Sequence, residues 1–255
     1  MIEIIEGYIR RFPDDAYLRY HAPRYSILLH LISENYKKGE RILDIGRSRL
    51  TDIISDSLKV SVDTLGFPPD SDNKTFGKHY QFDLNNCQSV QSWRKDIEPY
   101  DLIIFAEVIE HLYTSPNLVL SFINSITSQG GRVFLQTPNA VALHKRLKML
   151  IGMNPYERIR ESNQNPGHFR EYTKKEIKEY SGNTGFRVKK SLYGNYFDYR
   201  FSSNGLNLMS YKPQLKLFNH IYSLCPGSFK PGLTLVLVKE HDSSFASQPS
   251  TESGD

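Results

Sequence analysis

The sequence RILDIGRSRLTD, residues 41–52, predicts a strand, a tight turn and the start of a helix. Residues 41–44 favour an extended chain, Gly46 interrupts the apolar run, and a helical pattern opens at Leu50. In an open α/β sheet, a nucleotide-like ligand binds in the crevice beyond such a strand end. There Gly46 lets the backbone approach the ligand closely, and the start of the helix offers free N–H groups. A dinucleotide-binding loop has three glycines and this turn has one, so a purely structural turn is the alternative.

The composition limits the possible classes of protein. The chain has 255 residues, which suits one large α/β domain with insertions or two small domains. Hydrophobic residues make up only 39%, but the aromatic share of 12% can fill a core. The net charge of +4 forms no basic stripe along the sequence, so nucleic acid is not an expected partner.

A cytoplasmic location is predicted from what the sequence lacks. No apolar run reaches the roughly 18 residues that suggest a membrane span. Residues 1–12 carry acids where a signal peptide has its apolar core. Cys87 and Cys225 lie far apart and belong to no motif, which indicates a reducing compartment and argues against a cysteine-rich zinc site.

Acidic residues end two further predicted strands. Residues 59–63 form a short strand ending in Asp63, which could accept both ribose hydroxyls of a nucleoside; a solvated aspartate is the alternative. Residues 79–82 form a third strand, and the following Asp83 could accept a hydrogen bond from the amine of adenine. The alternative for Asp83 is a local turn closed by its own side chain.

The sequence predicts a single domain over residues 1–240, followed by a Ser-rich disordered tail over residues 241–255. Its clearest strand is residues 100–105, a continuous apolar run typical of the middle of a parallel sheet. Helix starts are predicted at Ser115-Pro116 and at the capping box of Thr173 and Glu176. The remaining parts are a helical lead-in (1–40, punctuated by Pro13 and Pro23), strands at 132–136, from 185 and at 233–238, and insertions at 140–167 and 195–230.

Six stretches occur in an order that is typical of one family. They are LDIGRS (43–48), VSVD (60–63), FDLNN (82–86), DLIIFAEVIEHL (101–112), GGRVFLQTPN (130–139) and HFREYTKKEIKEYSGNTGF (168–186). By these stretches the chain resembles the class I S-adenosylmethionine-dependent methyltransferases over about residues 38–240. The resemblance implies an α/β fold: a Rossmann-like, seven-stranded, mostly parallel sheet in the order 3-2-1-4-5-7-6, with helices on both faces and the two insertions as lids.

The resemblance also implies which residues hold S-adenosylmethionine. Asp44 and Gly46 would line the methionine part, Asp63 would hold the ribose, Asp83 with Leu84 would flank the adenine, and Ala106 with Glu107 would lie beside the sulfonium. The family usually has Gly-x-Gly in the first turn, whereas this chain has Gly46-Arg47-Ser48. The Cβ of Ser48 restricts the close approach, which would lower the affinity for the cofactor or shift the loop.

The residues after the clearest strand carry the candidate chemistry. Glu107, Glu110 and His111 stand at i, i+3 and i+4, so a helical turn beginning at Glu107 would place them on one face. An imidazole in general titrates near neutral pH, so His111 is the right kind of group to remove the proton of an attacking hydroxyl, with Glu110 and His168 beside it.

A metal site is the second interpretation of these residues. Glu107, Glu110, His111 and His168 would bind a divalent cation, Mg or Mn, as in the small-RNA 3′-end 2′-O-methyltransferases that they resemble. The third interpretation is structural: Glu110 pairs locally and His111 bonds to a backbone carbonyl. His168, Arg170 and Tyr172 would in either functional case belong to a lid over the substrate.

The acceptor is predicted from the second insertion. Residues 215–224 carry an apolar stripe at helical spacing, which either faces the core or meets lipid or a partner, so peripheral membrane contact is one hypothesis. Similar insertions occur in methyltransferases that resemble enzymes of surface-polysaccharide or lipid-linked glycan pathways. The predicted function is O-methylation of a hydroxyl on a small molecule, sugar or lipid-linked glycan. RNA 2′-O-methylation with a metal, and a non-catalytic methyltransferase-like binding module, are the alternatives.

Overall fold

The computed structural model describes residues 1–68, 77–162, 166–195 and 212–247, and its centre is one seven-stranded sheet. The strand order is β3-β2-β1-β4-β5-β7-β6, which confirms the predicted order. Only β7 runs antiparallel to its neighbours. The strands are β1 (Ile42–Ile45), β2 (Val62–Gly66), β3 (His79–Gln81), β4 (Tyr100–Ala106), β5 (Thr127–Pro138), β6 (Phe186–Gly194) and β7 (Gly232–Lys239).

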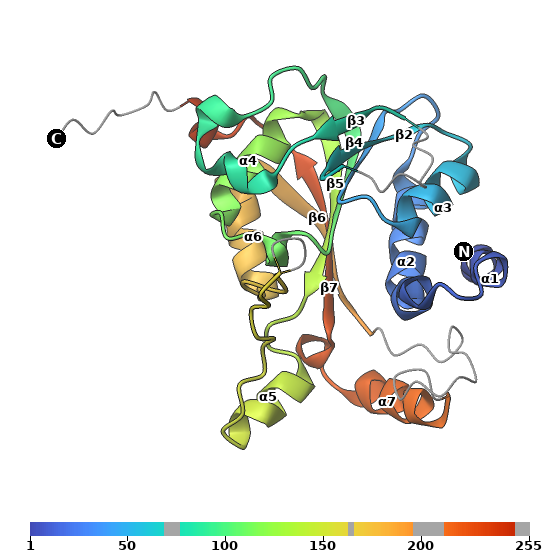
Figure 1. The fold of residues 1–255 in the computed structure, drawn as a ribbon. Helices are drawn as coiled ribbons and strands as arrows, with labels where there is room; N and C mark the ends of the chain where they lie inside the picture. Colours follow the sequence, from blue (N-terminus) through green and yellow to red (C-terminus); the bar gives the residue numbers. More distant parts are fainter. Residues whose placement is uncertain (69–76, 163–165, 196–211, 248–255) are drawn as a thin grey trace.

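Helices cover both faces of this sheet (Figure 1). One face is covered by α1 (Ile2–Arg11), α2 (Ala16–Asn35) and α3 (Arg49–Leu58), and the other by α4 (Pro116–Ser125) and α6 (Lys174–Asn183). The alternation of side chains along β4 divides the core accordingly. Leu102 and Ile104 pack with the first group of helices, whereas Ile103 and Phe105 pack with the second.

Short 3-10 turns complete the described secondary structure. They are η1 (Leu84–Gln88), η2 (Val90–Ser92), η3 (Ile109–His111), η6 (Gly227–Phe229) and η7 (Ser244–Ser247). Among the described residues, no helix is long and apolar enough to span a membrane.

Both insertions leave the sheet at the same edge. The parallel strands β1, β4 and β5 end there, and β7 begins there, because Pro138 of β5 lies opposite Gly232 of β7. The first insertion follows β5 and contains α5 (Leu143–Leu150); the second precedes β7 and contains α7 (Lys212–Leu224). Both helices lie below the sheet in Figure 1. The carboxyl edge of the sheet, where the family resemblance places the ligand, is therefore flanked by both insertions.

Some predicted boundaries are wrong. Pro23 does not interrupt the helical lead-in but lies inside α2, where the packed face of a 20-residue helix outweighs the loss of one hydrogen bond. The second strand continues through Thr64 and Leu65 to Gly66 and does not end at Asp63. The fifth strand is longer than predicted at both ends.

The tail is ordered at its start. Residues 241–247 were expected to be disordered, but Ser243 is buried against α4. Its hydroxyl lies 2.7 Å from that of Ser121, and its N–H donates to Asn124 Oδ1 at 3.3 Å. Residues 248–255, the rest of the predicted tail, lie outside the described residues.

Candidate active site

The end of β4 makes a sharp turn into the candidate site. Glu107 has a φ of 55°, in the left-handed region, and its N–H donates to Gln136 O on β5 at 2.7 Å. The helical turn that follows is the short η3, which begins only at Ile109. The prediction that Glu107, Glu110 and His111 share one helical face is therefore wrong, because Glu107 lies before the turn and not in it.

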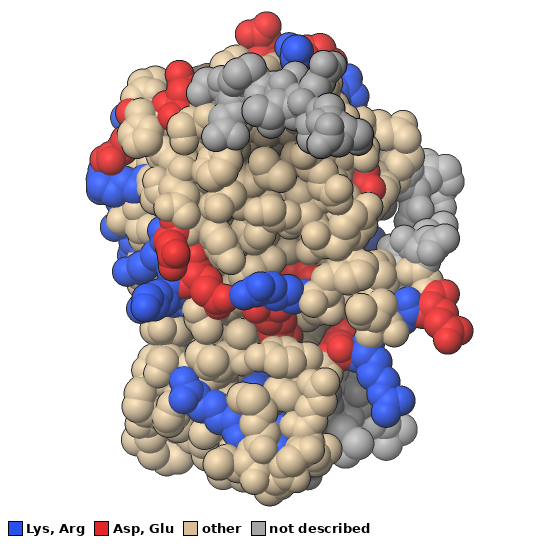
Figure 2. Space-filling model, turned by 90° about the vertical axis from the view of Figure 1, so that its left-hand side faces the viewer, with Lys and Arg blue, Asp and Glu red and all other residues tan. Residues whose placement is uncertain are grey.

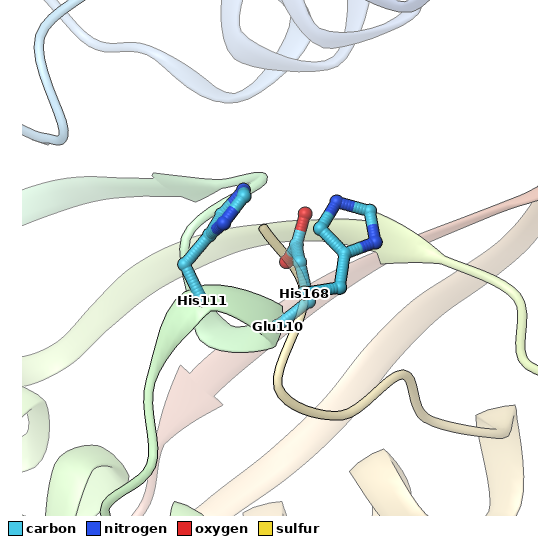
Figure 3. Close-up of side chains that lie close together, drawn as sticks. All are labelled: Glu110, His111 and His168. Atoms are coloured by element: carbon cyan, nitrogen blue, oxygen red, sulfur yellow. The ribbon is translucent and has the colours of Figure 1, made fainter. Parts of the chain in front are cut away.

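Glu110, His111 and His168 nevertheless come together. One ligand atom of each lies within 4.8 Å of the others, and Figure 3 shows the Glu110 carboxylate between the two imidazole rings. The segment around His168 is fastened to η3, since the N–H groups of Phe169 and Arg170 both donate to Glu110 O, at 2.8 and 3.3 Å. Glu107, the fourth member of the predicted metal set, does not belong to this cluster.

Hydrogen bonds fix both imidazole rings by their Nδ1 atoms. His111 Nδ1 lies 2.8 Å from Gly167 O, and a carbonyl only accepts, so this nitrogen carries the proton. His168 Nδ1 lies 3.1 Å from Glu171 Oε1. Each ring is thereby oriented and keeps its Nε2 lone pair for another partner. Histidines that bind metals are commonly held in this way by a carbonyl or a carboxylate.

Glu110 is fully buried and only half satisfied. Thr137 Oγ1 donates to its Oε2 at 3.0 Å, while Oε1 has no hydrogen-bond partner among the described residues. Burial raises the pKa of Glu110 well above its usual value, and the nearby Glu107 adds to the shift. A buried oxygen without a partner is costly, so this atom is suited to a ligand that brings a proton or a positive charge.

The cationic groups of the site are tied to its acids. Lys145 of α5 is buried and pairs with Glu171, the residue that orients His168. Burial lowers the pKa of Lys145 to about 8 and that of His168 to about 4. His168 is therefore neutral at physiological pH, with a lone pair available on Nε2.

The helical lead-in contributes a residue that the sequence analysis missed. Arg24 of α2 is buried, its Nη1 lies 3.7 Å from Glu107 Oε1, and its Nε donates to His21 Nδ1 at 2.6 Å. Tyr17 also approaches its guanidinium, with an Nη2 to hydroxyl distance of 3.4 Å. The signal was available: Arg24 stands four positions before Leu28, on the apolar side of the helical pattern, where a cation needs buried acids as partners.

The turn after β1 places its predicted residues as follows. Asp44 is buried, accepts a hydrogen bond from Thr51 Oγ1 at 2.5 Å, and has its pKa raised to about 7 by burial. Gly46 has a φ of 79°, and a Cβ there would lie 2.7 Å from Val108 Cγ2, so glycine is required for internal packing. Ser48 caps α3, since its Oγ accepts from Leu50 N–H at 3.2 Å.

The prediction for Asp63 needs correction. Asp63 is the second residue of β2 and lies level with Leu43, roughly 10 Å along the strands from Gly46 at about 3.3 Å per residue. Its two carboxylate oxygens accept from Lys78 N–H at 2.7 Å and from Tyr100 Oη at 2.6 Å. This geometry does not support a contact with a ribose at the carboxyl edge, so we assign Asp63 a structural role.

Asp83, Leu84 and Ala106 lie at or just after the ends of β3 and β4. Asp83 follows the end of β3 by two residues and caps η1, accepting from Asn85 N–H at 2.9 Å. This is the local turn that the sequence left open as its alternative. Leu84 is buried beside it, and Ala106 ends β4 directly before Glu107.

The charges at the carboxyl edge of the sheet favour a cationic ligand. Asp44, Glu107 and Glu110 lie at the ends of β1 and β4, and the buried Arg24 is the cation that lowers the pKa of both Asp44 and Glu110. The pKa values of Asp44 and Glu110 nevertheless remain raised, which indicates that Arg24 does not fully compensate the cost of burying these two acids. A ligand with a positive centre would compensate the remaining negative charge.

Comparison with known proteins gives a family match and a shared fold. The model of a methyltransferase domain family matches residues 17–191, which includes most of α2. No curated protein matches the chain significantly.

Solved structures that share the fold are distant in sequence. A SAM-dependent methyltransferase from Archaeoglobus fulgidus has 17% identity and a TM-score of 0.53, over 89% of this chain and 100% of that one. A putative methyltransferase of Haloferax volcanii, solved with the Trm112 activator, has 11% identity and a TM-score of 0.56, over 87% and 91%. The N-methyltransferase NodS of Bradyrhizobium japonicum, solved with S-adenosyl-L-homocysteine, has 11% identity and a TM-score of 0.51, over 91% of each chain.

Proposed function

The chain belongs to the methyltransferase domain family, as a class I S-adenosylmethionine-dependent enzyme, and from this premise we propose that it methylates a hydroxyl oxygen. The acceptor proposed is a small molecule, a sugar or a lipid-linked glycan. The observation that supports O-methylation is the cluster of Glu110, His111 and His168 beside the end of β4, because these groups can take a proton from an alcohol.

The residues of the crevice fit the cofactor by charge. The cofactor supplies an electrophilic methyl group on a sulfonium when it is bound. Asp44, Ala106 and Glu107 would hold the amino-acid end with its ammonium group, and Arg24, which pairs with Glu107, would lie near this end. Asp83 and Leu84 would flank the adenine. The binding of a cation beside Asp44 and Glu110 would offset the cost of burying these two acids.

His111 is the group that we assign to proton removal. Its Nδ1 donates to Gly167 O, so the Nε2 lone pair can accept the hydroxyl proton. The positive charge of the resulting imidazolium favours the ionised form of Glu110 beside it, so that the two groups stabilise each other. His168 orients the acceptor oxygen. A base placed in this way typically contributes about 10²–10⁴-fold to the rate.

A divalent cation is the second candidate, and the cluster itself favours it. Three ligand atoms lie within 4.8 Å, both histidines are oriented by Nδ1 hydrogen bonds, and Glu110 Oε1 has no hydrogen-bond partner among the described residues. One carboxylate and two neutral imidazoles suit Mn²⁺ or a similar transition metal, and Mg²⁺ less well. A metal there would lower the pKa of a bound hydroxyl.

The test of the proposal is the variant His111→Ala. We expect turnover to fall by about 10²–10⁴-fold while affinity for S-adenosylhomocysteine stays near that of the wild type, because the cofactor crevice does not include this ring. His30→Ala, at an exposed histidine of α2, is the matched control and should retain turnover. Full turnover of His111→Ala would contradict the assignment and leave this histidine a structural role.

Chelation separates the two candidate mechanisms. Activity that is lost with a chelator and restored by Mn²⁺ or Mg²⁺ would support a metal at Glu110, His111 and His168. Activity that is indifferent to the chelator would leave His111 as a plain base. Candidate acceptors should include alcohols and amines, because NodS is described as an N-methyltransferase.

Two further parts of the proposal rest on the sequence. A cytoplasmic location agrees with free cysteines at Cys87 and Cys225, of which Cys87 is buried. RNA is the less favoured acceptor, because the 32 basic and 28 acidic residues are nearly balanced.

A further inference from the structure

Both insertions expose large apolar side chains. Along α5 and just after it, Leu150 is 81% exposed, Ile151 72% and Met153 52%. On α7, Leu224 is 74% exposed. We call this surface the insertion pole and define it by Leu147, Met149, Leu150, Ile151, Met153, Leu217, Phe218, Ile221 and Leu224. The four residues of α7 in this set are exposed, so the alternative that this part of the apolar stripe faces the core is wrong.

The two helices present this surface together. His144 Nδ1 of α5 lies 3.1 Å from the hydroxyl of Tyr222 on α7, and Tyr222 is buried. The guanidinium of Arg146 lies over the ring of Phe229, in the turn after α7, at 4.9 Å. These contacts hold one side of each helix, and both helices lie at the lower end of the molecule in Figure 1. The apolar side chains named above remain exposed.

Charge distinguishes the insertion pole from the rest of the surface. The chain contains 28 acidic residues, yet none occurs in residues 111–156 or 199–239, the two stretches that contain α5 and α7. The same stretches contain basic residues, among them Arg146, Lys148, Lys216 and Lys230. Figure 2 shows the result on one face: the lower end carries Lys and Arg but no Asp or Glu, whereas both signs mix higher up.

We propose that the insertion pole docks on the surface of an anionic lipid bilayer. Leu150 and Ile151, at the end of α5, enter the boundary between headgroups and acyl chains, and Lys148 meets the anionic headgroups. Apolar side chains flanked by basic residues, in helices too short to span, are typical of interfacial binding. Exposed large apolar side chains that gather on one part of a protein commonly mark a protein or membrane interaction site.

The position of the pole connects it with the candidate active site. Lys145 of α5 pairs with Glu171, which in turn orients His168, so the base of the docking helix is part of the wall of the site. Docking therefore brings the carboxyl edge of the sheet close to the bilayer. This placement fits a lipid-linked acceptor, but docking itself does not require that the proposed methyl transfer be correct.

The experiment is flotation of the full chain with vesicles of two compositions. One set contains phosphatidylcholine alone, and the other contains phosphatidylcholine mixed with phosphatidylglycerol. We expect binding to the mixed vesicles, weaker binding to the neutral ones, and a loss of binding as salt is raised. No binding of the wild type to the mixed vesicles would overturn the proposal.

Paired variants test the surface itself. Leu150→Ser with Ile151→Ser should weaken binding to the mixed vesicles by about tenfold or more, because two largely exposed apolar side chains are removed. Lys148→Glu should weaken it by about fivefold or more. The matched controls are Phe67→Ser, at a 69% exposed side chain elsewhere, and Lys38→Glu; both should bind as the wild type does.

Two measurements distinguish lipid docking from misfolding and from self-association. Calorimetry with S-adenosylhomocysteine should give the same affinity for the pole variants as for the wild type, which shows that they are folded and that their cofactor crevice is intact. Sedimentation should give a monomer without lipid. A dimer that the double variant dissociates would show that a second copy covers the pole and would overturn the proposal, as would equal losses in the control variants.

Discussion

Asp63 shows how a residue can carry a family motif and a structural role at once. It stands in the stretch VSVD, but in the folded chain its carboxylate joins β2 to the backbone of Lys78 and the hydroxyl of Tyr100. Tyr100 is fully buried at the start of β4, and burial raises the pKa of its hydroxyl above the ordinary value. The carboxylate therefore satisfies a donor that has no access to water.

We expect Asp63→Ala to lower stability and not cofactor affinity. The free energy of unfolding should fall by about 1–3 kcal/mol, because the Tyr100 hydroxyl loses its acceptor. Urea denaturation measures this loss, and it should shrink when Tyr100→Phe is already present, since the donor is then absent. If the variant instead binds S-adenosylhomocysteine tenfold more weakly and keeps its stability, the structural role is wrong and Asp63 contacts the ribose.

The residue scale also shows which parts of the site were hidden in the sequence. Glu110, His111 and His168 could be named from the sequence, because the first two follow the clearest strand and the third precedes an easily recognised helix cap. The course of the backbone from β4 into this cluster could not be predicted, because it depends on a left-handed conformation at Glu107, which few glutamates adopt. Arg24 stands on the apolar side of a helical pattern, which indicates a buried cation, but the pattern does not show which acids lie opposite it.

At the scale of elements, the turn between β1 and α3 explains the missing second glycine. Ser48 occupies the N-cap of α3: its Oγ accepts from Leu50 N–H, and its own N–H donates to Thr51 Oγ1 at 3.1 Å. Thr51 in turn donates to Asp44. The cap, the helix and the buried acid are thus linked, and the serine stabilises the turn whether or not it limits the approach of the cofactor.

Two substitutions at this position should differ. Ser48→Ala removes the cap and should lower the free energy of unfolding by about 1 kcal/mol, whereas Ser48→Gly should cost only a few tenths. Ser48→Gly should also leave the affinity for S-adenosylhomocysteine unchanged or raise it, because the ligand can approach the backbone more closely without the Cβ of Ser48. Denaturation and calorimetry on the two variants measure both effects. A clear loss of affinity in the glycine variant would mean that the serine hydroxyl contacts the ligand.

At the scale of the whole molecule, the strand order was predictable because a fixed order of motifs implies it. The length of β5 and the end of β2 were not predictable, because they depend on pairing with the neighbouring strands, and pairing is not visible in a single stretch of sequence. The apolar stripe of α7 posed the same problem. Its spacing predicts a helix, but only tertiary packing decides whether Leu217, Ile221 and Leu224 are buried or exposed.

Burying acids at the site should make the stability of the whole molecule depend on pH. Burial raises the pKa of Asp44 from 3.8 to about 7, and it raises that of Glu110 in the same direction. Between the two pKa values of Asp44, the folded chain binds a proton that the unfolded chain has released. The free energy of unfolding should therefore fall as the pH rises from about 4 to about 7, with a slope from this group of at most about 1.4 kcal/mol per pH unit.

The variant Asp44→Asn isolates this contribution, because the amide mimics the protonated acid and cannot ionise. Urea denaturation of the ligand-free protein at about pH 5 and about pH 8 should show the wild type losing stability relative to the variant as the pH rises. Asp14→Asn, at an exposed aspartate, should keep the slope of the wild type. A difference between Asp44→Asn and the wild type that stays constant over this range would mean that Asp44 is already ionised at low pH. The excess negative charge of the crevice, and with it the argument from charge for a cationic ligand, would then be balanced within the protein.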